Sequence, residues 1–283
     1  MTPADGDWRK ARLAPWRPGP AERLRGLLRG AVIGVVTYGC LIPLLVLRIP
    51  ERLFCGHRRP LTPFITQFVC RSALRLMGLR LTVEGRPMQG QGAIVANHAS
   101  WLDIFVLNAC DRVFFVAKSE VGGWPGIGWL ARATGTVFIA RNGAEARAQT
   151  ALFETRLHLG HRLLFFPEGT STDALRVLPF KSTLFAAFLA PGLRDDLSIQ
   201  PVSVAYRAPP GADPRLYGWW DDMDFGPHFL RVLAQSPQGA VHVTFHPPRR
   251  AADFPDRKAL AAACEAAVRA GHAARQGAGP TRS

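Results

Sequence analysis

The stretch VANHASWLDIF, residues 95–105, marks a change from strand to helix in this chain. It opens at the end of a short apolar run, which is typical of a buried strand, and closes in a pattern typical of a helix. Between the two parts, Ser100 and Asp103 match the S-x-x-D capping pattern found at the start of many helices. The stretch therefore predicts a strand-to-helix turn, and helix capping is sufficient to account for Ser100 and Asp103.

Capping does not account for His98. A histidine at the carboxyl end of a strand stands where α/β sheets bind their ligands. From the first helical turn, Asp103 can reach back to the imidazole, hold one tautomer and stabilise the imidazolium. The spacing thus predicts a His98–Asp103 dyad that takes a proton from a hydroxyl group supplied by the substrate.

Beyond residue 79 the chain alternates short β-rich runs with helical patterns. The expected strands are 79–85, 93–97, 112–118, 136–141, 162–167, 199–206 and 240–246. The expected helices are 101–110, 124–133, 144–159, 182–190, 227–235 and 255–271. This alternation predicts an α/β domain over residues 80–271, a mixed sheet with helices on both faces. Pro201 indicates an edge strand or a strand entry, and residues 272–283 are expected to form a disordered tail.

Polar side chains stand at the ends of several of these strands. One strand leads into His98, two others end at Lys118 and Arg141, and a fourth runs into the loop FFPEGTSTD, residues 165–173. A lone arginine is more often a snorkelling group at a sheet edge, although its planar guanidinium can also grip a phosphate. The convergence of these groups at one edge favours a binding site.

The FFPEGTSTD loop has two interpretations. Pro-Glu-Gly is ordinary turn chemistry, and the hydroxyls that follow are able to cap a helix. Alternatively the loop forms an anion cradle, in which Gly169 lets backbone N–H groups approach a phosphate and Thr170 adds a hydroxyl. Glu168 cannot bind phosphate itself, so it is expected to orient a neighbour or to accept a substrate hydroxyl.

The composition indicates an anionic partner. The chain carries 35 Lys and Arg against 21 Asp and Glu, a formal net charge of +14, which suits nucleic acid or an acidic membrane surface. A basic-aromatic motif for RNA or DNA does not occur, so the membrane is favoured. The five cysteines are scattered without a CxxC pair, which fits neither a disulfide framework nor a zinc site and favours reduced thiols in a cytosol-facing protein.

An uncharged apolar segment, residues 31–47, follows a basic arm, residues 1–24. As a helix it reaches roughly 25 Å against a hydrocarbon core of about 30 Å, and Pro43 is expected to kink it. Basic residues flank it on both sides, which favours both ends lying on one leaflet.

The next segment, residues 62–79, has a polar stripe of Gln67, Arg71 and Arg75 opposite an apolar face. This pattern is typical of an interfacial amphipathic helix, with a core-facing helix as the alternative. Residues 25–79 are therefore expected to form a membrane-associated helical hairpin. It would hold the catalytic domain on the cytoplasmic side of the inner membrane.

Four blocks of this sequence carry a family resemblance. NHASWLD, GTVFIAR, FPEGTST and QPVSVAY, in this order and spacing, resemble the blocks of the PlsC-type lysophosphatidate acyltransferases. The resemblance covers roughly residues 75–210, and the first and third blocks are the most specific. One departure is PFKST, residues 179–183, where many members have a glycine two places after the lysine.

The resemblance implies a charge-relay pair, His98 and Asp103. It implies acceptor contacts from Arg141 and from the loop carrying Glu168, Gly169 and Thr170, with Lys118 assisting. It also implies an amino-terminal membrane-embedded helical pair. No cofactor is implied, because acyl-ACP or acyl-CoA serves as the co-substrate.

The expected function is O-acyl transfer to a lysolipid, first of all lysophosphatidate, which would give phosphatidic acid. The alternative acceptor is lyso-ornithine lipid, whose hydroxyl sits on a fatty acid and whose headgroup lacks phosphate, and one enzyme could use both. A non-catalytic lipid-binding protein is a further alternative. A serine hydrolase is disfavoured by the absence of a G-x-S-x-G elbow, and a nucleic-acid binder rests on charge alone.

Overall fold

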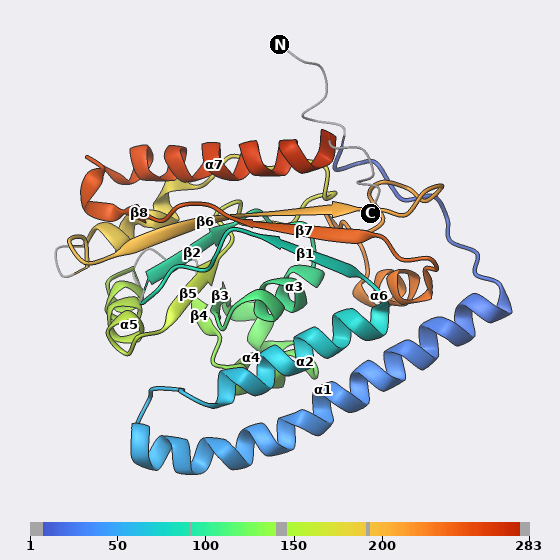
Figure 1. Cartoon of the computed structure of the whole chain (residues 1–283), viewed down its shortest axis with the longest axis horizontal. Coiled ribbons are helices and arrows are strands. Elements are labelled where there is room, and N and C mark those ends of the chain that lie inside the picture. Colours follow the sequence, from blue (N-terminus) through green and yellow to red (C-terminus); the bar gives the residue numbers. More distant parts are fainter. Residues whose placement is uncertain (1–7, 91, 140–145, 191–192, 278–283) are drawn as a thin grey trace.

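The computed structural model describes residues 8–90, 92–139, 146–190 and 193–277. These residues form an eight-stranded sheet with helices on both faces, so the predicted α/β fold is confirmed (Figure 1). The strands are β1 (Arg80–Glu84), β2 (Gly92–Ala96), β3 (Phe114–Lys118), β4 (Val137–Ile139), β5 (Arg162–Phe165), β6 (Ser198–Arg207), β7 (Ala240–Phe245) and β8 (Arg249–Arg250). The helices are α1 (Pro20–Cys55), α2 (Thr62–Met77), α3 (Leu102–Cys110), α4 (Ile127–Thr134), α5 (Ala146–His158), α6 (Phe225–Ala234) and α7 (Arg257–Gly277). Short 3₁₀ helices are η1 (Ser119–Gly123), η3 (Ser182–Leu189) and η4 (Ala251–Asp253).

The sheet is mixed, as expected. Its strand order is β1-β7-β6-β2-β5-β3-β4, with β8 also paired to β6. Strands β6, β2, β5, β3 and β4 run in one direction, whereas β7 is antiparallel to β6 and β1 is parallel to β7. Because β2, β3 and β5 are parallel, the segments that follow them meet at one edge of the sheet.

Two apolar layers hold the helices to the sheet. In β2, Ile94 and Ala96 belong to the cluster that packs on α2, α3 and α6. Ala93 and Val95 belong to the cluster on the other face, with α5, η3 and α7. Figure 1 shows this arrangement, with α7 on one side of the sheet and α2, α3 and α6 on the other. The alternation of side chains along β2 therefore fixes which face α3, the helix that follows it, must cover.

The prediction from Pro201 is wrong, because β6 has neighbours on both sides. The carbonyl of Pro201 accepts the His246 N–H at 3.0 Å, so its ring nitrogen faces the same side of the strand. On that side β7 ends at Phe245 and β8 begins at Arg249. Proline is tolerated in this central strand because the missing N–H falls in the gap between two partner strands.

The expected disordered tail is also wrong up to Gly277, since α7 continues to that residue. His272 is buried with its Nε2 at 3.3 Å from the Ala174 carbonyl, and Gln276 donates to the same carbonyl at 3.0 Å. These contacts with a distant loop hold the last turns of the helix in place. The rest of the expected tail, 278–283, lies outside the described residues.

The expected amino-terminal hairpin is present as α1 and α2. Helix α1 begins at Pro20, so the last residues of the expected basic arm belong to it. It continues through Pro43 and curves along α6 and α2 on one side of the domain (Figure 1). Among the described residues one helix, α1, is long enough and apolar enough to cross a membrane. This indicates membrane association.

Both ends of α1 are attached to the domain. Near its start, Arg25 donates to the Ala234 carbonyl at 2.7 Å and Arg29 donates to the Leu233 carbonyl at 2.9 Å. Both arginines thereby satisfy carbonyls at the carboxyl end of α6. Near its end, the buried Glu51 accepts the backbone N–H and the hydroxyl of Thr62, the first residue of α2. The helix therefore lies along the domain and does not project from it.

Candidate active site

The turn after β2 sets the direction of His98. The register between β2 and β6 ends at Ala96 and Val202. The next side chain, Asn97, then donates to the Val204 carbonyl and accepts the Val204 N–H, each at 2.8 Å. This amide pairs with the neighbouring strand as a backbone group would, and it is buried. The chain therefore leaves the sheet at a defined angle with His98 as the first residue beyond it.

The contact predicted between His98 and Asp103 is present. Nδ1 of His98 lies 2.7 Å from Oδ2 of Asp103, and the same oxygen accepts the N–H groups of Ala99 at 2.8 Å and Ser100 at 3.1 Å. The other oxygen, Oδ1, accepts the Tyr206 hydroxyl at 2.7 Å. One buried carboxylate thus serves both interpretations of the sequence, because it caps the turn before α3 and holds the imidazole.

These contacts select one tautomer of the His98 ring. A carboxylate surrounded by donors can only accept, so the Nδ1 atom of His98 carries the proton and Nε2 is the basic nitrogen. Burial, together with the charge of Asp103 and the hydrogen bond to it, raises the pKa of Tyr206 well above its usual value, so Tyr206 remains a donor. The His98 side chain is 21% exposed and stacks on Phe166 at 3.9 Å between ring centroids.

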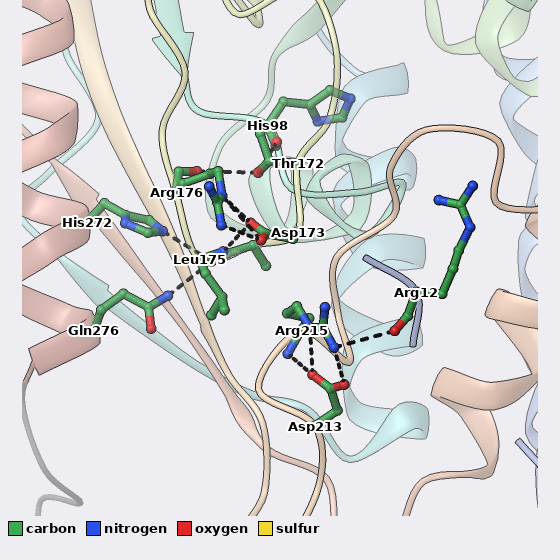
Figure 2. A network of polar contacts seen from close by, with 11 residues as sticks. Arg12, His98, Thr172, Asp173, Leu175, Arg176, Asp213, Arg215, His272 and Gln276 are labelled. Atoms are coloured by element: carbon green, nitrogen blue, oxygen red, sulfur yellow. Dashed lines mark hydrogen bonds and ion pairs between the residues drawn. The ribbon is translucent and has the colours of Figure 1, made fainter. Parts of the chain in front are cut away.

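The FPEGTST loop is joined to the backbone of His98. Oε1 of Glu168 accepts the His98 N–H and Oε2 accepts the Leu178 N–H, both at 2.7 Å. Thr172, in the same loop, also binds this backbone: its N–H and its hydroxyl donate to the His98 carbonyl at 3.0 and 3.1 Å (Figure 2). In Figure 2 the imidazole points away from these contacts, which leaves its ring for other partners.

Glu168 lies below the surface of the loop and contacts its backbone neighbours. Its side chain is buried and both oxygens accept backbone N–H groups, so it orients the His98 segment. Burial raises the pKa of Glu168 to about 8, opposed by the two backbone hydrogen bonds and reinforced by the charge of Asp103. Of the two roles considered for Glu168 from the sequence, the structure supports orientation of a neighbour.

A polar cleft of about 330 Å³ opens beside this loop. It is lined by Trp8, Arg9, Lys118, Gly169, Thr170, Ser171, Lys181 and Asp221. The structure thus brings together Lys118, Gly169 and Thr170, as the sequence predicted. Gly169 has a φ of +73°, and a Cβ there would lie 2.8 Å from the Lys181 Nζ, so glycine permits this approach. Arg141 lies outside the described residues.

Three groups of this site were missed by sequence reasoning. The first is Tyr206, which stands two positions after Val204 and four after Val202 and therefore shares their face of β6. Lys181 stands in the PFKST block, and its position beside Gly169 depends on the loop conformation, which no sequence pattern fixes. Trp8 and Arg9 come from the amino-terminal arm, where no motif marks them.

Known proteins resemble the chain over different extents. The Acyltransferase family matches residues 80–205. A lyso-ornithine lipid O-acyltransferase of Rhodobacter capsulatus is 59% identical over 254 residues, covering 90% of this chain and 92% of the relative. Another, of Pseudomonas aeruginosa, is 34% identical and covers 87% and 93%. A 1-acyl-sn-glycerol-3-phosphate acyltransferase of Neisseria gonorrhoeae is 39% identical over 129 residues, covering 44% and 50%.

The fold has a counterpart among solved structures. The crystal structure of the 1-acyl-sn-glycerophosphate acyltransferase PlsC from Thermotoga maritima matches with a TM-score of 0.58 and covers 92% of this chain and 100% of its own. At 21% identity this match concerns the fold alone. The near-full-length relatives carry the assignment further: the chain belongs to the acyltransferase family and is an enzyme that transfers acyl groups.

Proposed function

We propose that the chain is a lyso-ornithine lipid O-acyltransferase. The observation that carries this proposal is the 59% identity to the Rhodobacter capsulatus enzyme over nine-tenths of the chain. The lysophosphatidate enzymes of Neisseria match over about half of their length. Lysophosphatidate, the first acceptor expected from the sequence, therefore becomes the second candidate, and acyl transfer itself is common to both.

In the proposed mechanism, His98 Nε2 takes the proton from the acceptor hydroxyl while the oxygen attacks the thioester carbonyl of acyl-ACP or acyl-CoA. Asp103 stabilises the imidazolium that forms. This attack forms the new C–O bond. The C–S bond then breaks, and the departing sulfur receives the proton from His98. General-base catalysis of this kind contributes about 10²–10⁴-fold.

The cleft supports binding of the acceptor's anionic group. Lys118 and Lys181 supply positive charge beside the Gly169 backbone. Arg141, which the resemblance implies as a further contact, ends one of the strands expected from the sequence. These groups would set the acceptor's position, and His98 would meet the hydroxyl that this position presents.

The exposed face of α1 supports attachment to one leaflet. Its large exposed apolar side chains recur at helical spacing: Leu24, Leu28, Val32, Val35, Tyr38, Ile42, Leu45, Val46, Ile49 and Leu53. Its 36 residues extend about 54 Å, well beyond a core of about 30 Å, and both ends are tied to the domain. We infer that α1 lies in the plane of the anionic cytoplasmic leaflet of the inner membrane, with this stripe inserted.

Charged substitutions on this stripe are expected to release the enzyme from membranes. The double variant Val35→Asp and Ile42→Asp removes two insertions worth about 1.5–3 kcal/mol each, so vesicle binding should weaken at least about 100-fold. Co-sedimentation with anionic vesicles measures the binding of each variant. Leu152→Asp, on an exposed site of α5, is the matched control and should bind as the wild type. Unchanged binding of the double variant contradicts the in-plane arrangement.

The acceptor assignment is tested by a competition between two lysolipids. Purified enzyme in mixed micelles, given one acyl donor, is expected to use lyso-ornithine lipid with a kcat/KM at least about tenfold above that for lysophosphatidate. The reason is that a site built for one headgroup leaves polar groups unpaired with the other. A preference for lysophosphatidate would instead establish phosphatidic acid formation as the main activity.

A further inference from the structure

The polar cleft is lined by side chains of both signs of charge. Lys118 ends β3, Lys181 directly precedes η3, Arg9 comes from the amino-terminal arm, and Asp221 lies in the same lining. Asp221 also has a φ of +57°, which is uncommon for a residue other than glycine. A carboxylate in such a backbone conformation at the rim of a basic cleft calls for a specific role.

Asp221 carries charge that its neighbour does not fully balance. Arg12 lies 3.1 Å from an Asp221 oxygen through Nη1 and 2.8 Å from an Asp222 oxygen through Nη2. One guanidinium is therefore shared between two carboxylates, and the pair keeps a net negative charge. Asp222 is the more exposed of the two, 75% against 44%, and it does not line the cleft.

The segment that carries Asp221 is tied to the catalytic turn. The backbone N–H of Trp219 donates to the carbonyl of Ala99, the residue after His98, at 2.9 Å. Ser171, which lines the cleft, donates its hydroxyl to the Trp219 carbonyl at 2.5 Å. The rim with Asp221, the loop with Ser171 and the turn with His98 thus form one hydrogen-bonded unit.

The amino-terminal arm is fixed against the same rim. Arg176, held by Asp173 at 3.0 Å, lies over the Trp8 ring at 4.9 Å. Arg215 contacts the Arg12 carbonyl at 3.5 Å, as Figure 2 shows. These contacts place Trp8 and Arg9 as a wall of the cleft.

We propose that this cleft recognises a zwitterionic headgroup, with its basic side chains on a carboxylate and Asp221 on an ammonium group. The inference rests on the proposed function and deepens it. In a lyso-ornithine lipid the α-amino group is acylated, which leaves a carboxylate on the α-carbon and, three methylene groups beyond that carbon, a side-chain ammonium. Lysophosphatidate offers a phosphate and no cation. Asp221 is then a specificity-determining residue that favours the first acceptor over the second.

Asp221→Asn tests this assignment, with Asp222→Asn as the matched control. Asparagine keeps the shape of the side chain and tolerates the left-handed backbone, and Arg12 retains one carboxylate partner in either variant. Each protein is assayed with lyso-ornithine lipid and with the same lipid acetylated on its side-chain nitrogen, which removes the ammonium charge. Thermal unfolding verifies that both variants fold.

The wild type is expected to prefer the charged acceptor by roughly tenfold in kcat/KM, as for a charge-assisted hydrogen bond. Asp221→Asn should bring this ratio to about one, and Asp222→Asn should keep it. Equal ratios in the two variants, or no preference in the wild type, would overturn the role of Asp221. Failure of the wild type to acylate either ornithine lipid would instead overturn the proposed function, and the inference with it.

Discussion

Replacing His98 by alanine is expected to lower kcat by about 10²–10⁴-fold, the contribution of a positioned general base. The hydrogen bond from Nδ1 to Asp103 leaves Nε2 as the basic nitrogen, and alanine removes it. The effect should fall on kcat, because the polar cleft that would bind the acceptor does not include His98. Initial rates with saturating lyso-ornithine lipid and acyl-ACP measure it.

Asp103→Asn separates charge from shape in the same dyad. An amide oxygen in the Oδ2 position still accepts the N–H groups of Ala99 and Ser100. The NH₂ group then faces the Tyr206 hydroxyl, which can rotate to accept. The turn is therefore expected to fold, while the imidazolium loses its counter-charge and kcat falls nearly as far as with His98→Ala. Tyr206→Phe, which removes one donor and no charge, should lower kcat by less than about tenfold.

The control for both variants is His158→Ala, which removes an exposed histidine of α5. It should keep wild-type turnover. Vesicle binding and thermal unfolding of His98→Ala and Asp103→Asn should match the wild type, which ties the lost turnover to chemistry. Near-normal turnover of either variant would end the proposal that this pair acts as the base.

The parts of the site that could be predicted from the sequence are local. His98 and Asp103 are five residues apart, so one turn and one helix start are enough to bring them together. The alternation of strands and helices likewise predicts a parallel core, which brings the segments after β2, β3 and β5 to one edge. Lys118 and the Gly169 loop followed from that rule without knowledge of the strand order.

The parts that could not be predicted depend on pairings across long sequence separations. Tyr206 reaches Asp103 across 103 residues because β6 lies beside β2, and no local pattern fixes that neighbour. Glu168 meets the His98 N–H across 70 residues in the same way. The last turns of α7 were expected to be disordered from composition, yet the loop at Ala174 holds them. In the first two cases the partner is set by the strand order, and in the third it is set by how α7 packs against the sheet.

Glu168→Gln is expected to lower both stability and kcat, the latter at least about tenfold. Each oxygen of Glu168 accepts one backbone N–H, from His98 and from Leu178, and in the neutral acid the hydroxyl oxygen still has a lone pair for this contact. An amide has one acceptor oxygen, so its NH₂ group must face one of these donors. An unpaired buried donor costs about 1–3 kcal/mol, and the His98 turn loses an anchor. Denaturant unfolding at pH 5 and steady-state kinetics measure the two effects.

The pH dependence of stability provides the sharper test of Glu168. Burial raises the pKa of Glu168 from its usual value of 4.5 to about 8, so the native state holds this proton more tightly than the unfolded chain. Stability from this group is complete below about pH 4.5 and is lost as the pH rises to about 8, by roughly 5 kcal/mol if fully expressed. Glu168→Gln has no such proton, so its unfolding free energy should change less between pH 5 and 8.5 than that of the wild type. Glu120→Gln, at an exposed site, should follow the wild type. A parallel decline in Glu168→Gln would show that another group carries the pH dependence, and the buried carboxylate would then be ionised throughout as a permanent acceptor for the catalytic turn.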